Sequence, residues 1–314
     1  MAITNTTISD LVPNEKVLAG TVDLLMKDAN EIVNSGLAVR GVEVDAVAGG
    51  GPRKASIPFV NPLATTDYNI GNDDINDAGN VGKMTADEFS AIRHDINYGW
   101  GYADLARMVT TYDTQGGIAA GIAQYWASIY QQLAVSSIKG AGAVNSGLTF
   151  GDGTDALAVA MLVDAAATAE MYSDMFDILI VSPATKAKLR KLNAGNTFVP
   201  ASESNIKFDT FAGYKLLTSK AFGNTTSVLA RSGALSFGEG TPAGMVPVEI
   251  ERVANGGNGQ GASILHSRRS VVIHPQGFGY TGAVAPTKTN LEDSTKWELV
   301  VPVEQVGFRF IDHT

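Results

Sequence analysis

Residues 117–138 read GIAAGIAQYWASIYQQLAVSSI, and this stretch decides the architecture. Its apolar side chains recur along one face, which predicts a single helix of about six turns. Trp126 and Tyr130 widen that face, and the alanines between them suit close packing. We interpret Trp126 either as a core residue or as a contact between subunits.

A long polar segment precedes this helix. Residues 65–82 are rich in Asp, Asn and Gly, and residues 72–77 read NDDIND. A loop of this length is usually functional or disordered rather than a plain connection. At its base, residues 55–60 are extended, and Pro58 excludes a central strand position. Neither the loop nor the helix is suited to burial within one protomer, so the layout predicts a subunit that reaches its neighbours.

The composition is globular, since 45% of the 314 residues are hydrophobic and 18% are charged. The length allows one elaborated domain or two. No stretch is apolar enough, over about 18 residues, to span a membrane. The polar N-terminus lacks the basic and apolar regions of a secretory signal.

The chain has no cysteine, which excludes disulfides, thiolate nucleophiles and cysteine-bound zinc and suits a reducing cytoplasm. The net charge of −9 is modest, and no basic stripe of the kind that binds nucleic acid occurs. A protein of this kind could enclose nucleic acid without binding it tightly.

The remaining pattern alternates between helix and strand, with a glycine-rich turn at 255–261 that predicts a long hairpin. In chain order we expect a helix at 14–34, a strand at 37–47, a short helix or turn at 85–88, a strand at 93–100, a short helix at 102–110, a helix at 156–171, a strand at 177–181, a helix at 183–192, strands at 214–218 and 227–231, hairpin strands at 246–254 and 263–273, and a final β pair at 297–303 and 306–311.

This order of elements resembles that of the major capsid proteins of tailed bacteriophages, which have the Hong Kong 97-type fold. Two local patterns are similar as well: YGW at 98–100 leading to DLA at 104–106, and IHPQGFGY at 273–280 followed by APT at 285–287 and Trp297. The resemblance covers nearly the whole chain and rests mainly on the order of the elements.

The resemblance implies an α+β fold divided in the manner of that family. The expected parts are an N-terminal arm at 1–45, an extended loop (E-loop) with its flanking strands at 46–100, a peripheral domain with the spine helix at 101–150, an axial α/β domain at 151–275, and the C-terminal strands of the peripheral domain at 276–314.

The same resemblance implies a self-assembling subunit of an icosahedral phage head that encloses double-stranded DNA. Its partners would be other copies of itself in pentamers and hexamers, a portal, and in some relatives a decoration protein. Its place would be the virion capsid, after assembly in the cytoplasm of a host bacterium. The chain begins almost directly with the arm, so we expect a separate scaffolding protein and a precursor shell that expands.

Contacts in such a shell are heterologous and add through multivalency. Some relatives crosslink a loop lysine to an asparagine of a neighbour. Lys54 and Lys83 lie at the base of the loop, away from its acidic tip, so we expect a shell without covalent crosslinks. The candidates for inter-subunit contacts are Arg53, Lys54, Asp73, Asp74, Asp77, Lys83, Trp126, Arg268 and Arg269.

The acidic tip has two interpretations, a solvated loop end or a patch that docks onto basic residues of a neighbour. A calcium loop of the EF-hand type is excluded because Ala78 and Thr85 occupy the fifth and twelfth positions, where ligands are required. The four histidines are scattered, and no HExxH, Walker A or GxSxG sequence occurs. We therefore predict no catalytic, cofactor or metal site.

Two alternatives stay open at this point. An encapsulin-like nanocompartment shell would share the fold and differ in its cargo. An α/β enzyme built on residues 155–273 would need a convergent pocket, which the sequence does not indicate.

Overall fold

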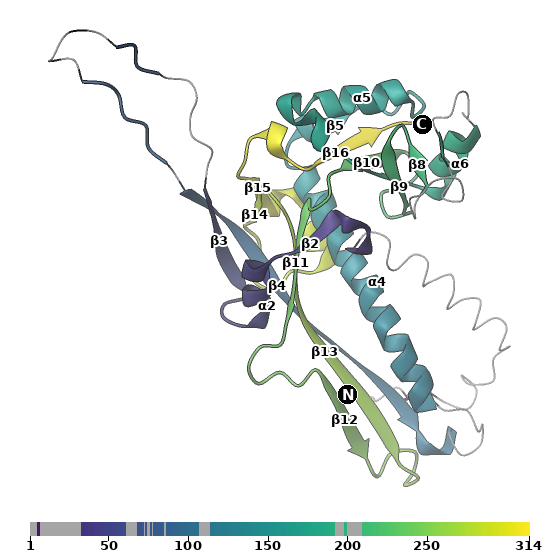
Figure 1. The fold of residues 1–314 in the computed structure, drawn as a ribbon. Coiled ribbons are helices and arrows are strands. Elements are labelled where there is room, and N and C mark those ends of the chain that lie inside the picture. The colour runs from purple at the N-terminus through teal and green to yellow at the C-terminus, as the bar shows by residue number, and fades with distance from the viewer. Residues whose placement is uncertain are drawn as a thin grey trace.

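The structure is a computed structural model that describes residues 5–6, 33–60, 68–71, 73, 76, 78–84, 86–106, 114–191, 198–199 and 209–314. The fold is mixed α+β, with two large sheets and a long helix, α4, that runs beside the first sheet (Figure 1). The helices are α2 (Val42–Gly49), α4 (Thr114–Gly142), α5 (Val159–Ala167), α6 (Pro183–Lys191) and α7 (Lys288–Glu292).

Two long strands carry the first sheet, β4 (Ala86–Ala103) and β13 (Ala262–Pro275), which pair antiparallel. β12 (Val248–Val253) and β13 form the hairpin that the glycine-rich turn predicts. That turn requires glycine at Gly261, where φ is +95° and a Cβ would lie 2.3 Å from Arg252 Nη2. The other strands of this sheet are β1 (Asn5–Thr6), β2 (Ala38–Arg40), β3 (Lys54–Val60) and β11 (Leu235–Gly240).

The second sheet is centred on β6 (Ile178–Val181), a buried run of apolar residues that pairs in parallel with β9 (Tyr214–Thr218). α6 follows β6 and starts at Pro183, where the missing N–H costs little. Ser182 caps it by accepting a hydrogen bond from the N–H of Thr185 at 3.0 Å. The remaining strands are β5 (Thr149–Phe150), β7 (Phe198–Val199), β8 (Thr210–Phe211), β10 (Thr226–Ala230) and β16 (Phe308–Asp312).

The last turns of α4 pack very closely against the C-terminal part of the chain. A Cβ at Gly140 would lie 1.9 Å from the carbonyl oxygen of Leu291, in α7. A Cβ at Gly142 would lie 1.9 Å from the ring of Phe310, in β16. The indole N–H of Trp297 donates to the same Leu291 carbonyl at 2.8 Å. Glycine thus lets α4 contact both α7 and the second sheet.

A buried arginine fixes β16 to its surroundings. Arg309 is fully buried, and its Nε donates to Thr168 Oγ1 at 2.9 Å. Its Nη groups donate to the carbonyl oxygens of Val303, Val306 and Phe308 at 2.8–3.0 Å. Burial lowers the pKa of Arg309 to about 10. Neutral acceptors therefore satisfy a charged group in the interior.

The strand expected at 37–47 is wrong in its second half. Residues 38–40 form β2, parallel to β11, but α2 starts at Val42. Asp45 explains the change of structure, because its carboxylate accepts from Arg40 Nε at 2.8 Å and from the N–H of Glu239 at 3.1 Å. These bonds hold the segment as a helix against β11. The helix expected at 14–34 lies, except for residues 33–34, outside the described residues.

The short helix or turn expected at 85–88 is strand where it is described, and the helix expected at 102–110 is strand only in its first two residues. Residues 86–88 begin β4 and pair with 58–60 of β3, and residues 102–103 end β4 opposite 262–263 of β13. Pairing with distant segments outweighs the local helix signal at both places. Residues 104–106 are helical, and residues 107–110 lie outside the described residues.

The final β pair is also wrong. β15 (Trp297–Leu299) pairs with β14 (Phe278–Tyr280), whereas β16 pairs with β10 and β5. The hairpin β12–β13 thus belongs to the sheet of β4, and β16 belongs to the sheet of β6. The expected boundary at residues 275 and 276 does not separate the two sheets, because the second sheet takes strands from both sides of it, β5 to β10 before it and β16 after it.

Candidate subunit-contact surfaces

The loop expected to reach neighbours leaves the body of the chain on a β hairpin. The first part of β4 pairs with β3 and its second part pairs with β13. The hairpin β3–β4 therefore extends beyond the point where the support of β13 ends, and the described parts of the loop lie farther out still (Figure 1). β3 pairs only with β4 among the described strands, and Pro58 is exposed on it.

The two arms of the loop are joined at one described point but are not buried. The Asn69 side chain donates to the carbonyl of Asn80 at 2.8 Å and accepts from its N–H at 2.9 Å, which joins the two arms. All described loop residues are exposed. The large apolar ones among them have exposed fractions of 84% for Tyr68, 79% for Ile70, 94% for Val81 and 67% for Met84. Apolar surface on an ordered projection is typical of a contact site.

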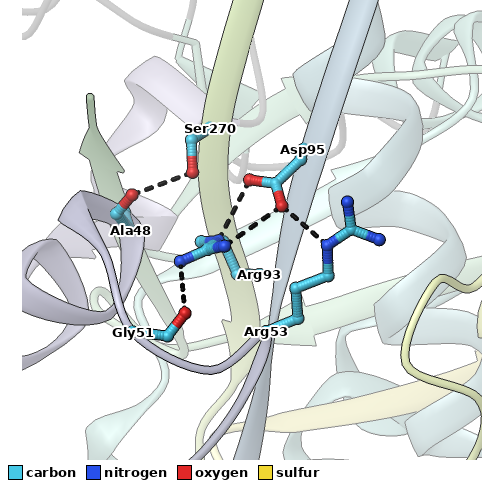
Figure 2. A network of polar contacts seen from close by, with 6 residues as sticks. All are labelled: Ala48, Gly51, Arg53, Arg93, Asp95 and Ser270. Carbon is cyan, nitrogen blue, oxygen red and sulfur yellow. Dashed lines mark hydrogen bonds and ion pairs between the residues drawn. The ribbon is translucent and has the colours of Figure 1, made fainter. Parts of the chain in front are cut away.

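At the base of the hairpin, Arg53 joins the polar network shown in Figure 2. Asp95 accepts from Arg53 Nε at 2.8 Å and from Arg93 Nε at 3.0 Å, and Arg93 also donates to the Gly51 carbonyl at 3.0 Å. Burial acts to raise the pKa of Asp95. Hydrogen bonds from Arg93 and Ser270, together with the positive charge of Arg93, outweigh burial, and the pKa of Asp95 lies below its ordinary value. The carboxylate therefore stays ionised between two guanidinium groups.

Arg268 lies beside this network. A pocket of 330 Å³ is lined by both Arg53 and Arg268 together with Arg93 and Asp95. Arg268 Nη1 donates to the Val246 carbonyl at 3.1 Å and lies 2.9 Å from Glu249 Oε2. The structure thus brings together two of the sequence-predicted contact residues, which are far apart in the chain.

Arg269 also lines this pocket, but its guanidinium group binds on the other side of the sheet. Successive side chains of a strand point to opposite sides of the sheet. Arg269 Nη1 donates to Glu239 Oε1 at 2.8 Å, and Tyr130 of α4 donates to the same oxygen at 2.9 Å. Burial and the Glu239 carboxylate raise the pKa of Tyr130. Arg269 therefore points toward α4, and the Arg268 side chain lies on the sheet face that α4 leaves uncovered.

Trp126 is buried in the core of the protomer, which is one of the two interpretations drawn from the sequence. Its side chain is 3% exposed, and its Nε1 donates to Ser267 Oγ of β13 at 2.9 Å. The ring also contacts Tyr125, which contacts Trp100 of β4. Trp126 thus anchors α4 to the first sheet and has no surface to offer a neighbour.

We expect Trp126→Phe and Ser267→Ala each to lower the free energy of unfolding by about 1–2 kcal/mol, because each leaves a buried group without its hydrogen bond. The double variant should lose less than the sum of the two, since both remove the same bond. Denaturant unfolding of the four proteins measures this. Strict additivity would contradict the assigned bond.

The other candidates lie along the loop and its base. Lys54 is partly buried in β3, whereas Asp73 and Lys83 are exposed. Asp74 and Asp77 lie outside the described residues. The roles of all five residues as subunit contacts stay predictions.

One exposed surface was missed by the sequence reasoning. Val246, Val248 and Ile250 are 51–55% exposed on and beside β12, which pairs only with β13 among the described strands. The alternation of Val248, Glu249, Ile250 and Glu251 is the signal that could have indicated it, because one apolar face of an edge strand needs a cover.

Among the described residues, no three His, Cys, Asp or Glu side chains group as they would around a metal ion. Over the same residues, no helix combines the length and apolar character that crossing a membrane requires.

Comparison with protein-family models and with curated proteins gives no match. Comparison with solved structures does. A chain of the capsid of Ralstonia phage GP4 is 12% identical, over 79% of this chain and 87% of that one, with a TM-score of 0.58. Chains from Mycobacterium phages Cain and Bobi are 10% and 11% identical, over 99–100% of this chain and 96–99% of those, also with TM-scores of 0.58. The chain therefore has a phage capsid protein fold, which confirms the expectation drawn from its sequence.

Proposed function

We propose that the protein is the major capsid protein of a tailed phage, a structural subunit that assembles into an icosahedral shell around double-stranded DNA. The observation that carries the proposal is the projecting loop, whose apolar side chains are exposed in the protomer. A protomer leaves this surface in water, whereas a shell covers it with a neighbouring copy. The likeness of 79% of the chain to the capsid chain of Ralstonia phage GP4 supports the same conclusion.

In the terms of the Hong Kong 97-type fold, we infer that β3, β4 and the loop form the E-loop and that α4 is the spine helix. The peripheral part would comprise α4 and the first sheet, including β12 and β13. The axial part would comprise the second sheet with α5 and α6. This division follows the observed strand pairing rather than a single cut in the chain.

We propose that the shell is held without covalent crosslinks. Lys54 sits in a paired strand at the base of the hairpin, opposite Ile92, and is only partly exposed. The tip of the loop carries aspartates where a crosslinking lysine would be needed. Intact mass under denaturing conditions tests this, and a ladder of covalent multimers would contradict it.

Electron microscopy of the purified protein, expressed alone and with an added scaffolding protein, tests the main proposal. We expect closed icosahedral shells, and we further propose that correct size depends on a separate scaffold and that the precursor shell expands. Regular shells of one size from this chain alone would contradict the scaffold proposal. A protein that stays monomeric with every scaffold would contradict the shell function, and shells that package an enzyme instead of DNA would indicate a nanocompartment.

Replacing residues 61–85 by Asn-Gly is expected to abolish shell formation and leave the protomer folded. Val60 and Ala86 are paired directly opposite each other, so a two-residue hairpin turn can join them. Electron microscopy and thermal unfolding measure the two effects. A second variant keeps the full length of the loop and changes Tyr68, Ile70, Val81 and Met84 to serine. It should also assemble poorly, because it lacks the exposed apolar side chains. Normal shells from either variant would refute the role of the loop.

A further inference from the structure

We propose that the pocket lined by Arg53, Arg93 and Arg268 binds the acidic loop tip, residues 72–77, of a second copy of the chain. The inference deepens the proposed shell function and rests on it. It names the surface on which the loop tip docks.

The pocket is built to receive carboxylates. Four arginines line it, Arg53 at the base of the β3–β4 hairpin, Arg93 in β4, and Arg268 and Arg269 in β13, and Asp95 is the single carboxylate in its lining. Arg93 is only 8% exposed and is fixed by Asp95 and the Gly51 carbonyl, so its position is set before any partner arrives.

Two of the guanidinium groups keep donors to offer. Arg53 donates to Asp95 through Nε alone, and its two Nη atoms point away from Asp95 in Figure 2. Among the described residues, none accepts from those Nη atoms. Arg268 binds through Nη1, which leaves its Nη2 and Nε. A guanidinium that still has parallel N–H groups is suited to bidentate binding of a carboxylate.

The loop tip supplies the complementary group. Its sequence NDDIND carries three aspartates within six residues. Asp73 is exposed, and no ion pair between this residue and a basic side chain occurs among the described residues. On either side of the tip, Asn69 and Asn80 are hydrogen-bonded to each other, so the two arms of the loop lie close together where they lead to residues 72–77.

The tip of the same copy does not serve its own pocket. Arg53 lies next to the first residue of β3, and the loop leaves from the last one, Val60. Seven paired residues place the two ends about 20 Å apart. The described loop residues are all exposed and lie farther out in the same direction (Figure 1). A second copy is therefore the occupant that can bring aspartates to this face.

Binding of a labelled peptide with residues 68–81 tests the docking directly. We expect the peptide to bind the folded protein at low salt and to weaken as salt screens the charges. Binding should fall about tenfold for Arg53→Glu combined with Arg268→Glu, and by a similar factor for a peptide in which Asp73, Asp74 and Asp77 are asparagine. Arg252→Glu is the matched control. Arg252 lies on the β12–β13 hairpin, as Arg268 does, and is ion-paired with Asp104, but it does not line the pocket. It should leave peptide binding unchanged.

Charge exchange tests the contact in assembly. Arg53→Glu with Arg268→Glu should reduce shell yield, as should Asp73→Lys with Asp74→Lys, and combining both sets should restore part of it. Thermal unfolding checks that each variant is folded. Loss of assembly with the arginine variants but not with the aspartate variants would overturn the proposal and indicate another acidic partner. So would the absence of peptide binding together with normal shells from the aspartate variants.

The shell function and the loop-tip contact can fail independently of each other. If the wild-type chain forms no shells but binds the peptide through Arg53 and Arg268, the contact stands and the shell function falls. If it forms shells while the peptide and the charge variants have no effect, the shell function stands and the contact falls.

Discussion

Gly140→Ala is expected to lower the free energy of unfolding by about 3 kcal/mol, even though alanine is the better helix former. The added methyl would lie 1.9 Å from the Leu291 carbonyl and 2.6 Å from Trp297 Nε1. Neither neighbour can yield cheaply, because the two are hydrogen-bonded to each other and both are buried. α4 would have to separate from α7.

Gly121→Ala is the matched control on the same helix. Apart from the turns of its own helix, a Cβ at Gly121 meets no atom of the described residues within 4 Å, and the residue is exposed. This change should raise the free energy of unfolding by about 0.5–1 kcal/mol through helix propensity alone. Denaturant unfolding of both variants measures the contrast. A stabilising effect of Gly140→Ala would show that α4 and α7 do not make the close contact.

Acidification is expected to destabilise the protein through two buried histidines. Burial lowers the pKa of His94 to about 4, and the negative charge of Asp95 opposes this shift. Burial also lowers the pKa of His274 to about 4. The hydrogen bond to the Phe278 carbonyl opposes that shift, and the nearby His94 adds to it. In the unfolded chain both return to the ordinary value of 6.5. The unfolded state then binds protons more readily between these values. The contribution of the two neutral histidines to the free energy of unfolding is fully present above pH 6.5 and is lost as the pH falls toward 4.

The expected loss between pH 7 and pH 5 is about 2 kcal/mol for each histidine. Denaturant unfolding across that range measures it. His94→Leu should reduce the pH dependence by about half, because His94 Nε2 is buried with no hydrogen-bond partner and an apolar side chain suits the site. His266→Gln is the control, since His266 is partly exposed and paired with Glu251. A pH profile unchanged by His94→Leu would contradict the assignment.

The sequence predicted the elements that depend on local pattern. The helix at 117–138 lies inside α4, the hairpin lies at β12–β13, and the strand–helix pair at 177–192 appears as β6 and α6. The composition of these segments and their turn residues decide them, so neighbours in the chain carry enough information.

The elements that the sequence did not predict depend on distant partners. β4 is 18 residues long because one part of it pairs with β3 and the other with β13. The helix signals at 85–88 and 102–110 could not reveal either partner. The same holds for the arginine pocket. Arg53 and Arg268 were both candidates, but only the antiparallel register of β4 and β13 brings Arg268 to the side of Arg93 and Asp95.

The length of β4 has a mechanical consequence. The strand spans roughly 55 Å at about 3.3 Å per residue. Its first residues carry the loop, and Gly101 and Tyr102 near its far end pair with the N-terminal strand β1. The loop and β1 are thus attached to opposite ends of one long strand, and Trp126 of α4 is hydrogen-bonded to Ser267 of β13, the strand that pairs with β4. A force applied at the loop is therefore transmitted along β4 to β1. When β4 tilts as a rigid unit about its contact with α4, the loop and β1 move together in opposite directions.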